Sequence, residues 1–245
     1  MPDANCPECD GTGWKIVERE EISGAVKCNC VDFTVNVISR ANIPPLYANA
    51  SFENFRIPDE VIERHELSQA FFAVRTFVRE FPAAKKPGLL LMGGHGTGKT
   101  HLAVAALRAI VAKGHEGLFF DYQHLLDRIR SSYDSASQLL DKEAYRDAME
   151  SEVLLLDDLG SHRNVTDWVE DTVTSIVTAR CNNRKPLIAT TNLVDPAAGY
   201  STSDLRTTLE QRLGPRARSR LFEMCRIVKL SGAVGDFRER KQGAS

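Results

Sequence analysis

The sequence predicts an α/β fold with a parallel sheet, and three observations support this prediction. An apolar run at 89–92 leads into a glycine-rich segment, and a helical pattern of apolar residues follows. A second apolar run, 153–156, is followed by two carboxylates, and a further strand is expected over 187–192, which ends in an asparagine. These runs alternate with stretches of helical periodicity, an order typical of parallel strands in one sheet. Further strands are expected at 117–121 and 225–230.

The glycine-rich segment fits the pattern G-x-x-x-x-G-K-[ST], in which backbone N–H groups surround a phosphate. In this pattern the Lys99 ammonium reaches the β- and γ-phosphates, and the Thr100 hydroxyl ligates Mg²⁺. The helix predicted over 100–113 directs its positive N-terminal end at the same anion. A chance glycine-rich turn is the alternative, but the strand before the segment and the helix after it argue against that. The residues expected to bind a nucleoside triphosphate are Gly93, Gly94, His95, Gly96, Thr97, Gly98, Lys99 and Thr100.

Composition limits the class of protein. A chain of 245 residues accommodates one substantial domain and a small appendage. Because no apolar stretch is long enough to span a bilayer, we expect a soluble, cytoplasmic protein without a membrane partner. The N-terminus lacks the regions of a signal peptide, which favours thiols or metal ligands over disulfides for the six cysteines. The formal net charge of −2 gives no overall attraction to nucleic acid, so any such binding needs a local patch.

Four of the six cysteines lie near the N-terminus in two close pairs, Cys6 with Cys9 and Cys28 with Cys30. Two pairs separated by 18 residues fit two turns that converge on one tetrahedral Zn²⁺, with 15–22 available as a hairpin strand. The C-x-C spacing of the second pair departs from the usual C-x-x-C. Unliganded thiols are the alternative, but so polar a segment can bury few of them, and redox catalysis is less expected still. We expect a small module whose folding depends on the metal.

The segment after this module resembles a linker. Apolar residues recur at helical spacing over 31–41, and Pro44 and Pro45 end any helix there. We therefore divide the chain into a zinc-binding module with its linker at 1–45 and a nucleotide-binding domain at 46–245.

Helical periodicity marks three further stretches of the second domain. An amphipathic helix is expected over 59–81, capped by Asp59. The stretch 122–150 is expected to form two helices with a break at 131–137, and 165–183 to form another.

Polar side chains follow two of the predicted strands. In nucleotide hydrolases with a phosphate-binding loop, the first acid at such a strand end joins the Mg²⁺ shell and the second lies near the attacking water. Asp157 is therefore expected on the metal and Asp158 near the water, whereas two solvated acids are the alternative. Asn192 is expected to hold the same water between the carboxylates and the γ-phosphate.

Arginines gather near the C-terminal end of the chain. As an isolated feature this run indicates a solvated basic face, but a series of motifs offers another explanation. In chain order the series is 93–100, 154–160 (LLLDDLG), 190–192 (TTN), 219–221 (SRL) and 236–238 (DFR). The set covers roughly 51–240 and resembles the DnaC/IstB-like AAA+ ATPases, in which Asp-Asp-Leu-Gly replaces the more common Asp-Glu.

This resemblance implies a role for each motif residue. It implies a five-stranded parallel AAA+ core without the C-terminal helical lid, and it makes 122–150 the helical insertion of the replication-initiator branch. The implied roles are Walker A for Lys99 and Thr100, Walker B for Asp157 and Asp158, sensor I for Asn192, arginine finger for Arg220 and sensor II for Arg238.

The resemblance also implies a function. DnaC-type loaders place a replicative DnaB-type helicase on single-stranded DNA during replication initiation or restart, and an N-terminal domain, in some cases with zinc, holds the helicase. We expect slow ATP hydrolysis that is stimulated by a partner or DNA, and self-association through the ATPase domain. An IstB-like ATPase that assists a transposase is one alternative. A non-hydrolysing, nucleotide-gated adaptor is another, because Asp158 is one methylene shorter than the usual Glu.

Overall fold

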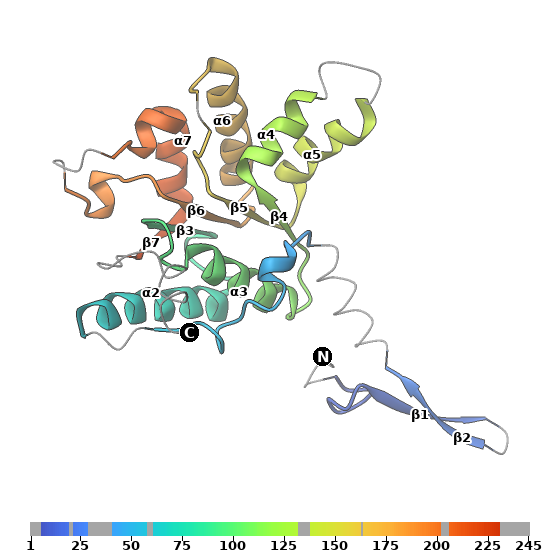
Figure 1. Cartoon of the computed structure of the whole chain (residues 1–245). Helices are drawn as coiled ribbons and strands as arrows, with labels where there is room; N and C mark the ends of the chain where they lie inside the picture. Colours follow the sequence, from blue (N-terminus) through green and yellow to red (C-terminus); the bar gives the residue numbers. More distant parts are fainter. Residues whose placement is uncertain are drawn as a thin grey trace.

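The computed structural model of the chain (Figure 1) describes residues 6–19, 22–28, 41–57, 61–131, 138–162, 164–201 and 206–230. The strands are β1 (Trp14–Arg19), β2 (Ile22–Lys27), β3 (Gly88–Gly93), β4 (Gly117–Asp121), β5 (Val153–Asp157), β6 (Leu187–Thr191) and β7 (Cys225–Leu230). The helices are α2 (Val61–Glu80), α3 (Lys99–Val111), α4 (Tyr122–Ser131), α5 (Gln138–Glu150), α6 (Asp167–Asn182) and α7 (Leu209–Met224), and two short 3₁₀ turns cover Pro45–Tyr47 and Pro196–Ala198.

Five strands form one parallel sheet in the order β4-β5-β6-β3-β7, which confirms the predicted fold class. Strands β5, β6 and β3 are neighbours in this order, so their carboxyl ends lie at the same edge of the sheet. In open sheets of this kind, ligands bind at the carboxyl ends of the strands. The loop at 94–98 and the polar residues that follow β5 and β6 all start from this edge.

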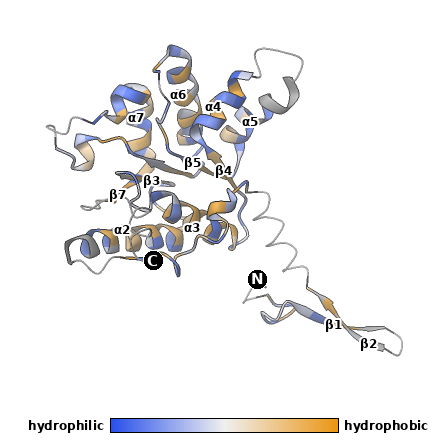
Figure 2. Cartoon of the chain, in the orientation of Figure 1, coloured by the Kyte–Doolittle hydropathy of each residue, from blue (hydrophilic) through white to orange (hydrophobic). Residues whose placement is uncertain are grey.

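Helices cover both faces of the sheet (Figure 1). Alternate residues of a strand point to opposite faces, so Leu90 and Met92 belong to the core under α4 to α7, and Leu89 and Leu91 to the core under α2 and α3. Figure 2 shows hydrophobic and hydrophilic residues mixed along α2 and α3, as expected for helices with one side on a sheet. Both cores are built from residues of the predicted strands and helices.

Helix α7 has no counterpart among the sequence-based predictions, which gave a solvated face as one interpretation of its arginines and an arginine finger at Arg220 as another. The helix begins at a capping box in which the Thr208 hydroxyl accepts a hydrogen bond from the Gln211 N–H and the Gln211 side chain accepts one from the Thr208 N–H. Gly214 interrupts it with a positive φ of 79°, and the Glu170 carboxylate fills the space that a Cβ there would need. The solvated-face interpretation is wrong for Arg212 and Arg218, whose guanidinium groups are partly buried and hydrogen-bonded.

The N-terminal part forms a two-stranded antiparallel sheet, with Trp14 paired to Lys27 and Arg19 to Ile22. The hairpin strand expected within 15–22 is present as β1, but its bounds differ, because β1 begins at Trp14 and ends at Arg19 and β2 begins at Ile22. Three features expected from the sequence lie outside the described residues: the segment 31–41 apart from Ala41, the cap Asp59, and the break at 132–137.

Among the described helices, none is long and apolar enough to cross a membrane.

Candidate nucleotide site

The loop between β3 and α3 is held in a phosphate-binding conformation. Gly96 and Gly98 have φ values of 68° and 88°, in the left-handed region that favours glycine. A Cβ on Gly93 would lie 2.3 Å from the Leu230 carbonyl oxygen, so this position also requires glycine. The Thr97 hydroxyl donates to the Gly94 carbonyl at 3.0 Å and closes the turn. His95 is at the exposed tip of the loop.

The Lys99 side chain links this loop to the end of β6. Its ammonium donates to the Gly94 carbonyl at 2.6 Å and to Asn192 Oδ1 at 2.7 Å, and the residue is 7% exposed. A charged β- or γ-phosphate oxygen would accept a stronger hydrogen bond from this ammonium than the neutral Gly94 carbonyl does. Two residues predicted from separate motifs therefore share one hydrogen bond.

Asp157, at the end of β5, is surrounded by hydroxyl groups. The Thr100 hydroxyl donates to Asp157 Oδ1 at 2.9 Å, and the Thr190 hydroxyl donates to the same oxygen at 2.6 Å. Burial raises the pKa of Asp157, and the hydrogen bonds from Thr190 and Thr100 oppose that rise. A buried carboxylate beside a threonine hydroxyl is the donor set that hard cations such as Mg²⁺ prefer.

Asp158 begins the turn after β5, with a φ of 57° that is uncommon for a residue other than glycine. Its N–H donates to the Thr190 hydroxyl at 2.8 Å, which holds the backbone in place. Its Oδ1 accepts a hydrogen bond from Asn192 Nδ2 at 2.6 Å. The side chains of Lys99, Asn192 and Asp158 thus form one continuous hydrogen-bonded chain across three strand ends.

Thr190 is a functional residue that sequence reasoning missed as an individual. Its hydroxyl donates to Asp157 and accepts from the Asp158 N–H, so one side chain orients both acids. The sequence feature that could have identified Thr190 is its position two residues before Asn192, at the end of a predicted strand. Residues two apart along a strand point to the same face of the sheet.

A second missed feature is the segment before α2, which lies over the loop. The Phe55 ring contacts Gly98 closely enough that a Cβ there would lie 2.7 Å from it, and the ring stacks on Phe71. His101 Nε2 is 3.0 Å from the Ser51 carbonyl oxygen, which ties this segment to α3. In the sequence, only the aromatic residues within 52–55 pointed to this contact. Aromatic residues in such a place more often belong to the hydrophobic core than to a binding site.

The donor set fits a magnesium nucleotide: one nearly buried ammonium, a glycine loop with left-handed φ values, a hydroxyl and a buried carboxylate.

A family model described as IstB-like ATP binding protein matches residues 73–235. The chain belongs to this IstB/DnaC-like family of AAA+ ATP-binding proteins. The resemblance inferred from the sequence motifs is confirmed.

Several relatives of this IstB/DnaC-like chain carry names or solved structures. The replicative helicase loader DnaC of Escherichia coli (strain K12) is 29% identical over 191 residues, which is 74% of this chain and 73% of the relative. The phage-like element PBSX protein XkdC of Bacillus subtilis (strain 168) is 22% identical over 98% of this chain and 87% of its own. A crystal structure of the DnaC helicase loader aligns with a TM-score of 0.62 and 35% identity, and covers 76% of this chain and 99% of that one.

The N-terminal thiols of this IstB/DnaC-like chain form a separate candidate site. The sulfur atoms of Cys6, Cys9 and Cys28 lie within 4.8 Å of one another, and all three residues are buried. Cys6 Sγ and Cys28 Sγ are 3.7 Å apart. This matches the edge of about 3.8 Å that Zn–S bonds of about 2.3 Å give in a tetrahedron. The Gly13 N–H donates to Cys9 Sγ, as expected for a thiolate ligand, and Cys30 lies outside the described residues. The three residues fit zinc.

Arg220 and Arg238 were the other predicted catalytic residues. Arg220 lies on α7 at a groove between α6 and α7, where its Nη1 donates to Glu223 Oε2 at 2.6 Å. The structure does not bring it to the Lys99 loop. Arg238 lies outside the described residues.

Proposed function

We propose that this chain hydrolyses ATP at the edge of the sheet where β3, β5 and β6 end. The observation that carries the proposal is the hydrogen-bonded chain from Lys99 through Asn192 to Asp158. It brings together a cation that can bind phosphate, a polar amide and a carboxylate that can position water, the kinds of group that phosphoryl transfer to water uses. The Thr100–Asp157 pair beside it supports a Mg²⁺ position.

Each residue takes one role in this proposal. Lys99 exchanges its loop carbonyl for the β- and γ-phosphate oxygens. Thr100 and Asp157 hold Mg²⁺, which neutralises phosphate charge when bound. Asp158 orients the attacking water and accepts its proton, and Asn192 fixes the Asp158 carboxylate through its amide N–H. A shorter Asp in place of Glu shifts the base away from the water, which favours slow turnover.

Steady-state ATP turnover tests this proposal. Lys99→Ala is expected to remove most ATP affinity, and Asp157→Ala to abolish Mg²⁺-dependent turnover while some nucleotide binding persists. Lys85→Ala removes an equal charge from an exposed site and serves as the control. Turnover by both site variants at the wild-type rate would contradict the assignment. If the wild-type chain binds ATP but does not hydrolyse it, even when single-stranded DNA is added, the result would favour a nucleotide-gated adaptor.

We further propose that the nucleotide state controls the loading of a DnaB-type replicative helicase onto single-stranded DNA. The support is the likeness to the replicative helicase loader DnaC and to the DnaC helicase loader structure. The family model is named for IstB, so a transposase is the second candidate partner. Capture of a hexameric helicase or of a transposase from the host, followed by identification, separates the two.

The N-terminal residues 1–45 are proposed as a zinc-bound docking module for that partner, separate from an ATPase domain at 46–245. The three gathered thiols support the metal. Elemental analysis of protein purified without chelator is expected to give about one zinc per chain. A value near zero that does not change on replacing Cys6 and Cys9 by Ser would contradict it.

A further inference from the structure

The turn that begins at Asp158 is tied to the neighbouring strand β6. The Leu159 N–H donates to the Thr190 carbonyl at 2.7 Å, and the Thr191 hydroxyl donates to the Leu159 carbonyl at 2.8 Å. The Ser161 N–H donates to the Asp158 carbonyl at 3.1 Å and closes the turn. These contacts fix the first half of the turn, and other elements hold its far end.

The residue at the far end is His162, which contacts both α4 and α7. Its Nδ1 lies 2.9 Å from the hydroxyl of Tyr122, the first residue of α4, and the two residues are 6% and 1% exposed. Its carbonyl accepts a hydrogen bond from Arg212 Nη1 of α7 at 2.7 Å. Its Nε2 is buried and has no hydrogen-bond partner in the part of the chain that the structure describes. Within that part, Tyr122 is therefore the one hydrogen-bond partner of the imidazole ring.

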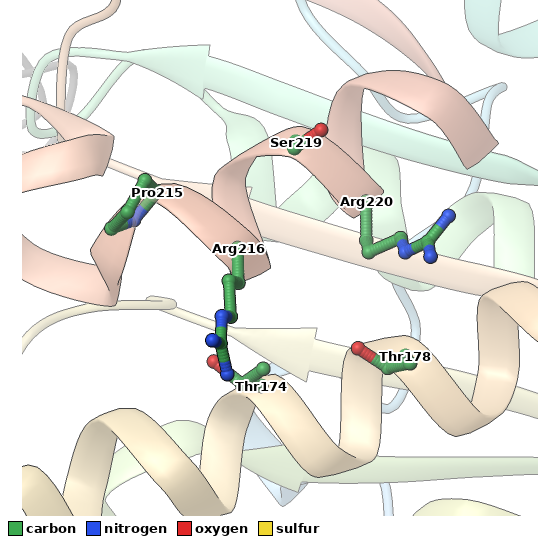
Figure 3. A pocket seen from close by; sticks show the side chains of 6 residues that line it. All are labelled: Thr174, Thr178, Pro215, Arg216, Ser219 and Arg220. Atoms are coloured by element: carbon green, nitrogen blue, oxygen red, sulfur yellow. The ribbon is translucent and has the colours of Figure 1, made fainter.

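The arginines of α7 divide between its surface and the segments that follow the strands. Arg216 and Arg220 line a groove of about 660 Å³ between α6 and α7 (Figure 3). Arg212 does not line this groove and donates instead to the segment after β5. Arg218 donates to Asp195, in the segment after β6. Helix α7 thus supports, through Arg212, the turn that carries the second acid.

Asp158 needs this support because of its backbone conformation. Its φ of 57° lies in the left-handed region, which is costly for a residue other than glycine. Such a conformation persists only where the surrounding contacts over-determine it. In this conformation the Asp158 carboxylate accepts a hydrogen bond from Asn192 Nδ2 at 2.6 Å. A φ that relaxed to negative values would turn the carboxylate away from that amide.

The Tyr122–His162 contact joins two uncharged groups at neutral pH. Burial raises the pKa of Tyr122. Burial also lowers the pKa of His162, and the nearby Arg212 charge lowers it further. Removal of either partner leaves a buried polar group without its hydrogen bond, which is unfavourable in the apolar surroundings of these two residues.

We infer that the Tyr122–His162 hydrogen bond positions the Asp158 carboxylate so that it can orient the attacking water. The inference rests on the proposed ATP hydrolysis. The pair holds one end of a short turn whose other end is Asp158, so loss of the hydrogen bond allows the Asp158 backbone to relax. Neither side chain binds phosphate or Mg²⁺ in the proposal above. The pair should therefore govern the rate of hydrolysis and not the affinity for ATP.

A double-mutant cycle tests this inference. Tyr122→Phe removes one hydroxyl and is expected to lower kcat about two- to tenfold, the range for one hydrogen bond, with the Kd for ATP within about twofold of wild type. His162→Leu removes the other partner and should lower kcat at least as much. The Tyr122→Phe/His162→Leu chain should be no slower than His162→Leu, because the same hydrogen bond is lost only once. Tyr145→Phe, a half-buried tyrosine of α5 in the same core, is the matched control and should behave as wild type.

A conservative variant distinguishes the hydrogen bond from packing. In His162→Asn the side-chain amide can take the place of Nδ1 and bond to the Tyr122 hydroxyl. We expect His162→Asn to recover most of the kcat that His162→Leu loses. The recovery should disappear in Tyr122→Phe/His162→Asn, which has no hydroxyl to bond.

Hydrogen exchange separates this inference from the proposed hydrolysis, because exchange needs no turnover. Without nucleotide, the amides of 158–161 are expected to exchange about two- to tenfold faster in Tyr122→Phe than in wild type, with those of β3 unchanged. Mass spectrometry of the peptides measures both. If the wild-type chain does not hydrolyse ATP, the proposed function fails, and faster exchange at 158–161 still supports the positioning contact.

Three results would overturn the inference. The first is wild-type kcat in Tyr122→Phe. The second is a fall in ATP affinity as large as the fall in kcat, which would indicate a general effect on the fold. The third is unchanged exchange at 158–161 in Tyr122→Phe.

Discussion

At the scale of single residues, the candidate site contains a buried carboxylate, Asp157, that we propose as a Mg²⁺ ligand. Burial raises the pKa of Asp157, so the folded chain disfavours the ionised form that Mg²⁺ needs. The Thr190 and Thr100 hydroxyl groups offset part of this cost. A residue that serves to bind a cation commonly lowers the free energy of unfolding when the cation is absent.

This leads to a prediction for Asp157→Asn. The amide oxygen can still accept from both hydroxyl groups, while the buried charge is removed. We expect the thermal midpoint without Mg²⁺ to rise by about 2–4 °C, equivalent to about 1 kcal/mol in a chain of this size, and ATP turnover to be lost. Calorimetry beside a turnover assay checks both. A lowered midpoint would mean that the carboxylate stabilises the fold.

At the scale of elements, Arg180 of α6 connects parts of the chain far apart in the sequence. The residue is fully buried, and burial lowers the pKa of its guanidinium to about 9. It donates to the carbonyls of Ala148, Glu152 and Pro186 at 3.0, 3.2 and 2.6 Å. These contacts join the end of α5, the start of β5 and the start of β6. A buried cation whose two terminal nitrogens both donate to carbonyl groups fixes the spacing between those elements.

Replacing Arg180 tests this role. Arg180→Ala removes the side-chain donor that these carbonyl groups share and opens a cavity, so we expect a loss of about 3 kcal/mol or more in the free energy of unfolding. Arg79→Ala, on the surface of α2, is expected to change it by less than about 0.5 kcal/mol. Urea unfolding measures both, and similar midpoints for the two variants would contradict the assignment.

The sequence predicted the elements whose apolar pattern is strong and left out those defined by polar contacts. Strands β3, β5 and β6 were found because their interiors are uniformly apolar, and Lys99, Asp157 and Asn192 followed from their place at strand ends. Helix α7 was missed because its charged residues mask a short apolar stripe and Gly214 interrupts it. The partners of Arg212 and Arg218 are residues far away in the chain, His162 and Asp195. Periodicity carries no information about such pairs.

At the scale of the whole molecule, the thiol cluster adjoins the two-stranded sheet, whereas the candidate nucleotide site lies at the edge of the five-stranded sheet. We expect chelation to expose Cys6, Cys9 and Cys28 to iodoacetamide at pH 8 and to weaken partner capture, with ATP affinity unchanged. Burial raises the pKa of Cys225 to about 12, so this thiol should stay unmodified and serve as an internal control. Mass spectrometry of the labelled peptides checks this. Equal labelling with and without chelator would argue against a metal.

The central claim is that one ATP site controls the placement of a helicase on DNA. The most direct test is the unwinding of a forked substrate, coated with single-strand-binding protein, by the purified DnaB-type helicase of the host. With ATP, the wild-type chain and Lys85→Ala are expected to stimulate unwinding equally, and Lys99→Ala to stimulate it at least tenfold less. Unwinding that is the same with and without the chain, or the same with Lys99→Ala as with wild type, would contradict the account.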